Sequence, residues 1–136
     1  MTVIDILGHA RALVRDPECW AKHALARTSD KLLLARSELN KAASYSVPGA
    51  LIRAQQLLCA NDATLDRAVS FVLGRMRARS TAPENRMAAL EHWNDTTCHG
   101  DILDTLSLAT ADAVDYEQRQ EALAVEACKH LATKPF

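Results

Sequence analysis

One stretch of the sequence, residues 46–59, restricts the fold more than any other. Its apolar residues recur with the spacing of one helix face; they are Val47, Ala50, Leu51, Ala54, Leu57 and Leu58. Ser46 can cap the first turn, and Pro48 fits there because the N–H that proline lacks would have no partner within the helix. Gly49 adds no side-chain bulk, so another element can approach this helix closely. We predict a buried helix around which the rest of the chain packs.

Length and composition favour one helical domain. The chain has 136 residues, of which 49% are apolar, and this suffices for one hydrophobic core but not for two. Glycine, proline and aromatic residues are few, as is typical of helical proteins. We predict an all-α domain of five or six helices over residues 1–132, or a mainly α domain with a minor β-hairpin. Residues 133–136 are expected to form a frayed tail.

Charge and local composition disfavour several classes of protein. The net charge of −1 argues against a strongly acidic DNA mimic and against a globally basic nucleic-acid binder. The first residues lack a signal-peptide pattern, and no run approaches the roughly 20 apolar residues of a transmembrane helix. The four cysteines form no C-x-x-C pair, so neither a disulfide framework nor a zinc ribbon is indicated. We expect a cytoplasmic protein that has no cofactor and no membrane contact.

Capping signals divide the rest of the chain into helices. Thr2 and Asp5 resemble a capping box at the start of a first helix. Asn61 should cap a helix that packs antiparallel to the central one. Pro83 should open a further helix, and the polar stretch at residues 93–100 predicts a helix–loop–helix corner.

Two segments leave alternatives open. In residues 21–45, two short apolar runs flank a polar triplet at residues 28–30, which fits a hairpin within residues 24–35 or two short helices. Residues 101–132 keep a helical spacing without glycine or proline, which fits one long helix or two helices divided at residues 112–115.

The corner contains the first candidates for a binding site, Trp93, Asn94 and Asp95. We expect Trp93 to be buried. Asn94 and Asp95 should hydrogen-bond to backbone groups at the end of their own helix and in the following turn. A site for a ligand or a partner protein is the alternative interpretation of this tripeptide.

A metal or hydrolytic site at His92, Cys98 and His99 is a further alternative. These side chains can converge around a corner, with Glu91 or Asp95 beside them. Their spacing matches no standard zinc motif, and neither an oxyanion hole nor an orienting residue accompanies the Cys–His pair. We therefore predict no metal ion and no catalytic residue.

Arg75, Arg77 and Arg79 belong to the main basic concentration of the chain. Arginines at such spacing can attract the phosphate backbone of a nucleic acid. No aromatic residue lies between them and no helix-turn-helix signature accompanies them, so a solvated helix end is favoured. Cations are stabilised at that end by the helix dipole.

Three landmarks follow one another along the chain. They are Trp20 with residues 24–27 after it, the helix start Gly49-Ala50-Leu51, and the tripeptide Trp93-Asn94-Asp95. Together they resemble a family of short, uncharacterised bacterial and phage proteins that is known as a domain of unknown function. The resemblance covers residues 6–113. It implies a small, mainly helical domain in a bacterial or phage setting, and it implies no activity.

These observations favour a non-enzymatic module that binds another protein or itself. The last predicted helix is the best candidate for a homodimer surface, through Tyr116, Leu123 and Ala127. Nucleic-acid binding through the arginine face is the first alternative function, and the metal or hydrolytic site is the second.

Overall fold

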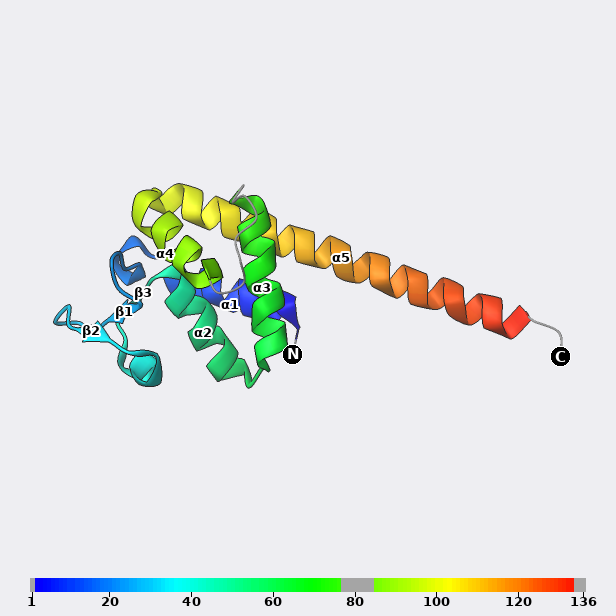
Figure 1. The fold of residues 1–136 in the computed structure, drawn as a ribbon, viewed down its shortest axis with the longest axis horizontal. Helices are drawn as coiled ribbons and strands as arrows, with labels where there is room; N and C mark the ends of the chain where they lie inside the picture. Colours follow the sequence, from blue (N-terminus) through cyan, green and yellow to red (C-terminus); the bar gives the residue numbers. More distant parts are fainter. Residues whose placement is uncertain (1, 77–84, 134–136) are drawn as a thin grey trace.

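The structure, a computed structural model, describes residues 2–76 and 85–133 (Figure 1). Its α-helices are α1 (Val3–Val14), α2 (Val47–Leu58), α3 (Asp62–Arg75), α4 (Arg86–Thr96) and α5 (His99–Thr133). Between α1 and α2 lie the 3-10 helices η1 (Pro17–Cys19) and η2 (Arg36–Lys41) and the strands β1 (Ala26–Arg27), β2 (Leu33–Leu34) and β3 (Ser44–Tyr45). The fold is mainly helical with a minor sheet, as the composition predicts.

Helix α2 lies at the centre of the packed elements, as the sequence predicts. Residues 47–52 are all buried, and α2 contacts α1, α3, α4 and η2. The Ser46 hydroxyl accepts a hydrogen bond from the Gly49 N–H at 3.1 Å, which is the predicted cap. A Cβ atom at Gly49 would overlap the backbone carbonyl of Leu25, so the predicted close approach is made by a loop. Only glycine fits this position without a shift of that backbone.

Helices α1 and α3 cover α2 and begin as predicted. Thr2 and Asp5 form a complete capping box, and the hydrogen bond from the Thr2 backbone lowers the pKa of Asp5. The Asn61 side chain caps α3 through the Thr64 N–H at 2.8 Å. The predicted helix start at Pro83 lies outside the described residues, and α4 begins at Arg86 within them.

The uncertain segment contains the hairpin. Strand β1 pairs antiparallel with β2, with Ala26 opposite Leu34, so the hairpin interpretation is confirmed and the alternative of two short helices is wrong. Strand β1 also pairs antiparallel with β3, in the order β2-β1-β3. The η2 turn lies between β2 and β3. A strand of two residues is too short to show a period of two in the sequence.

Helix α5 runs without a break through residues 112–115, which resolves the second alternative in favour of one helix. Its first half packs on α1 and α3 and buries Ile102, Leu106, Ala109 and Ala113. After Ala113 the helix leaves the packed elements and extends away from them (Figure 1). We call residues 2–76 and 85–113 the body and residues 114–133 the projecting segment.

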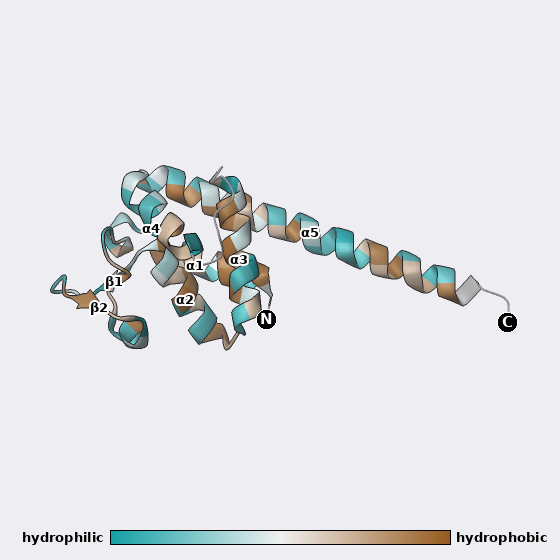
Figure 2. Ribbon diagram, in the orientation of Figure 1, coloured by the Kyte–Doolittle hydropathy of each residue, from teal (hydrophilic) through white to brown (hydrophobic). Residues whose placement is uncertain are grey.

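Side chains on the projecting segment are mostly in solvent. Every residue from 118 to 131 is exposed, although hydrophobic residues recur among the hydrophilic ones along the helix (Figure 2). Leu123 and Leu131 are 63% and 69% exposed. Within the described ranges, no helix combines the length and the apolar character that crossing a membrane requires.

Candidate functional site

Asn94 on α4 connects three parts of the body through one buried amide. Its Oδ1 accepts hydrogen bonds from the indole N–H of Trp20 at 2.7 Å and from the Val47 N–H at 2.9 Å. Its Nδ2 donates to the Ala21 carbonyl at 2.9 Å. Asn94 has no exposed surface, so these bonds form away from water, where an unpaired polar group is costly. The amide joins the loop after η1 and the start of α2 to α4.

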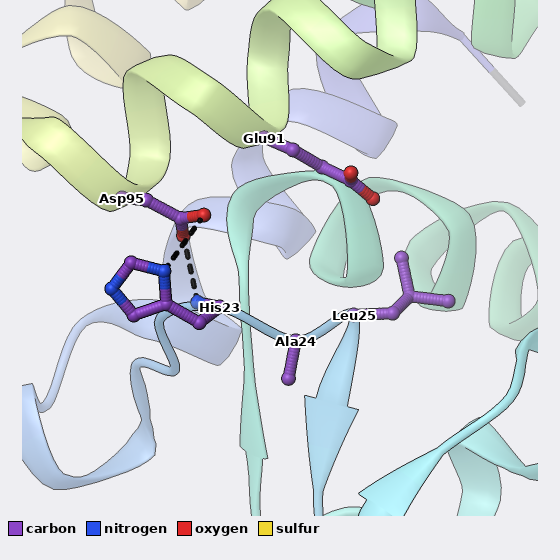
Figure 3. A pocket seen from close by; sticks show the side chains of 5 residues that line it. All are labelled: His23, Ala24, Leu25, Glu91 and Asp95. Atoms are coloured by element: carbon purple, nitrogen blue, oxygen red, sulfur yellow. Dashed lines mark hydrogen bonds and ion pairs between the residues drawn. The ribbon is translucent and has the colours of Figure 1, made fainter.

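Asp95 fixes the same loop one residue further along α4. Its Oδ1 accepts a hydrogen bond from the His23 N–H at 2.8 Å, and its Oδ2 lies 3.4 Å from Nδ1 of the His23 ring (Figure 3). His23 has a positive φ of 59°, a conformation that costs a non-glycine residue about 1 kcal/mol or more. The Asp95 carboxylate therefore holds the loop in a conformation that its own backbone disfavours.

An open pocket lies beside this contact, between the loop and α4. It is lined by His23, Ala24, Leu25, Glu91 and Asp95 (Figure 3). Glu91 and Asp95 are one helical turn apart and both extend from α4 toward the loop. The Asp95 carboxylate is already engaged by His23. The pocket is thus an acidic recess next to a structural contact.

The residues of the proposed metal alternative do not converge. Nε2 of His99 lies 2.7 Å from the Val14 carbonyl, and its ring packs 5.3 Å from the Trp20 ring. His92 and Cys98 are exposed. In the part of the chain that the structure describes, no three His, Cys, Asp or Glu side chains form a group that could hold a metal ion. His99 instead ties α5 to the end of α1.

Arg75 is exposed, and its guanidinium forms an ion pair with Asp112. Its Nε and Nη2 each lie 2.6 Å from an oxygen of Asp112 on α5, in a bidentate arrangement. The hydrogen bonds and the opposite charges raise the pKa of Arg75 and lower the pKa of Asp112. The other two arginines of the predicted face, Arg77 and Arg79, lie outside the described residues. Of the predicted basic face, the structure thus describes Arg75 alone, and Arg75 pairs with Asp112.

Tyr116 stands where the projecting segment begins. Its ring lies 6.0 Å from the Phe71 ring, and the Arg67 guanidinium lies 5.5 Å from the Tyr116 ring centre. Leu123 and Ala127 follow at steps of seven and four residues, so the three predicted dimer residues share one side of the helix. The structure therefore places these three residues on one face of α5.

Sequence reasoning missed the partners of Asn94 and Asp95. Both were expected to bond within their own helix end and turn, whereas their principal partners lie 47 to 74 residues away. Trp20 and His23 had no local pattern that linked them to α4. The only available signal was that a Trp indole N–H needs an acceptor when it is partly buried.

Residues 1–113 match the model of a family described as "Family of unknown function (DUF6197)", and the chain belongs to that family. This confirms the expectation of a domain of unknown function. No curated protein and no solved structure matches the chain. The family match ends at Ala113, the last residue that α5 buries in the body, so the projecting segment lies beyond the matched region.

Proposed function

We propose that this member of a family of unknown function is a non-enzymatic protein-interaction module, and that the projecting segment is its contact element. The observation that supports the proposal is that the side chains of α5 change from buried to exposed after Ala113. Before this residue α5 packs on α1 and α3 and buries Ile102, Leu106 and Ala109, whereas beyond it Leu123 and Leu131 are exposed. Burying such side chains is worth about 1.5 to 3 kcal/mol each.

The helical state of the segment supports the same proposal. Residues 118–131 are all exposed, and an unpacked helix of this length is only marginally stable in water, since most helical stability in proteins comes from packing of an apolar face. Its internal ion pair, Arg119 with Asp115 at 3.0 Å, is exposed and contributes little. A partner that covers the apolar face would supply the missing stabilisation.

The polar candidates elsewhere have structural partners, which supports a non-enzymatic role. Asn94, Asp95 and His99 each hold another segment of the body. Nucleic-acid binding is less well supported, because Arg75 already pairs with Asp112. We therefore assign the corner to the stability of the body and the projecting segment to recognition.

Site-specific photo-crosslinking in cells tests the proposal without knowledge of the partner. A photoreactive amino acid at Ala124, on the projecting segment, is expected to give a covalent adduct with a protein of defined mass. The matched control is the same amino acid at Leu32, which is 65% exposed, in the hairpin at the other end of the molecule from the projecting segment (Figure 1). An adduct from Leu32 with none from Ala124 would contradict the proposal and move the contact surface to the hairpin.

A further inference from the structure

The buried positions of α5 follow a spacing that continues into solvent. Ile102, Leu106, Ala109 and Ala113 are separated by four, three and four residues, and all are buried. Continuing the alternation gives the next positions, which we call the outer seam: Tyr116, Gln120, Leu123 and Ala127. An alternation of three and four residues is the 3.5-residue repeat of helices that supercoil around one another. The outer seam therefore has the pattern of a helix that pairs with a second helix.

We propose that the second helix is the projecting segment of another copy of this chain, and that the two run antiparallel. This inference rests on the proposed function and names its partner. The axis of the pair passes between Glu121 and Ala122. Tyr116 then lies opposite Ala127 of the other copy, and Gln120 lies opposite Leu123. At each end of the pair the large Tyr116 side chain thus faces the small Ala127 side chain, which allows the helices to approach closely.

The charges beside the outer seam support this direction. Arg119 and Glu126 each precede a seam residue, Gln120 and Ala127, so they flank the same edge of the seam. In the antiparallel pair Arg119 faces Glu126 of the other copy, and the two-fold axis repeats this contact. In a parallel pair Arg119 would face Ala124, and Glu126 would face Leu131. Only the antiparallel arrangement brings opposite charges together.

The position of Gln120 bears on the register of the pair and not on its direction. It is the one amide in the outer seam, and it lies next to the proposed axis, where the two copies of Gln120 are about 4.5 Å apart along the helix. A polar residue at a single seam position sets the register of paired helices at a cost in stability.

Reversing the charges of Arg119 and Glu126 tests directly whether the two helices run antiparallel. Arg119→Glu and Glu126→Arg should each weaken the dimer about tenfold in sedimentation equilibrium, because each places like charges across both contacts. The double variant Arg119→Glu/Glu126→Arg should regain most of the affinity. Asp115→Asn is the control, since it removes the ion pair within the helix and leaves the contact between copies unchanged.

Each outcome decides the inference. Rescue by the double variant supports the antiparallel pair. A dimer that neither single variant weakens would contradict this direction while leaving the proposed interaction role intact. A chain that stays monomeric at hundreds of micromolar would overturn self-pairing. In that case an adduct between Ala124 and a different protein would still support the proposed function. If the chain neither forms a dimer nor gives an adduct from Ala124, both proposals are overturned.

Discussion

The body and the projecting segment use the same kind of helix but differ in what stabilises it. In the body, apolar positions of α5 are covered by α1 and α3, and polar side chains such as Asn94 join segments far apart in the sequence. In the projecting segment, the apolar positions continue at the same spacing but are exposed. The comparison shows that an amphipathic pattern specifies a buried face without specifying which chain covers it.

The family match follows the same division. Residues 1–113 belong to the matched region and contain every residue of the described core, from Val3 to Ala113. Residues 114–131, whose side chains the structure describes, add no buried side chain to that core. The proposed recognition element thus lies outside the matched region, and variants can alter the two parts of α5 separately.

Loss of the Asn94 amide should produce the largest effect on the body. Asn94→Ala removes the hydrogen-bond partner of the Trp20 indole, the Val47 N–H and the Ala21 carbonyl, and we expect the free energy of unfolding to fall by about 4 kcal/mol. Urea unfolding measures the change. Glu91→Gln, at an exposed position of the same helix, is the control and should change it by less than about 0.5 kcal/mol. A loss under about 1 kcal/mol at Asn94 would contradict its assigned role.

A leucine-to-alanine substitution should reduce the free energy of unfolding more in the first half of α5 than in the second. Leu106→Ala creates a cavity at a fully buried position, so the free energy of unfolding should fall by about 3 kcal/mol. Leu123→Ala, at a 63% exposed position on the same seam, should change the stability of the monomer by less than about 0.5 kcal/mol. Similar losses at both positions would remove the distinction between body and segment.

Two glycines sharpen the account of the central helix. Gly49→Ala should destabilise by about 2 kcal/mol, because the added methyl meets the Leu25 carbonyl. Gly74→Ala adds the same methyl to α3, where nothing lies within 4 Å, and should stabilise by about 0.5 kcal/mol. Thermal unfolding should show a lower melting temperature for Gly49→Ala and a higher one for Gly74→Ala than for the unaltered protein. A neutral Gly49→Ala would mean that the loop does not constrain α2.

The smallest effect should come from the first capping box. The pKa of Asp5 is lowered in the folded protein, so its ionised form stabilises α1 above the ordinary pKa of 3.8, and this contribution is lost as the pH falls through the lowered value. Asp5→Asn should therefore flatten the fall in stability between about pH 5 and pH 2. An unchanged slope in acid unfolding would show that the box contributes nothing measurable.

Local features could be predicted from the sequence, and contacts between distant segments could not. Ser46, Asn61 and the Thr2–Asp5 pair act on neighbours within three residues, so their roles follow from residue type and spacing. The hairpin was one of two alternatives because its strands have only two residues each. The partners of Asn94 depend on how α4 packs against a loop 73 residues earlier, and no local pattern records that.

For the candidate site, the sequence predicted the positions on the helix but not their exposure. The seam positions Tyr116, Leu123 and Ala127 are visible as a periodic pattern, and the structure places them on one helix face. That this face is exposed could not be known, since the pattern is identical to that of Leu106 and Ala113 in the body. Only the structure shows which part of this helix face is covered by the body and which part is exposed.

Amide hydrogen exchange along α5 at two protein concentrations tests the central claim most directly. The account predicts slow exchange for residues 102–113 at every concentration, since they are held by the body. Residues 118–131 should exchange rapidly in dilute solution and become protected at high concentration, where the outer seam is covered. Protection of residues 118–131 that equals that of the body in dilute solution, or that never appears at any concentration, would contradict the account.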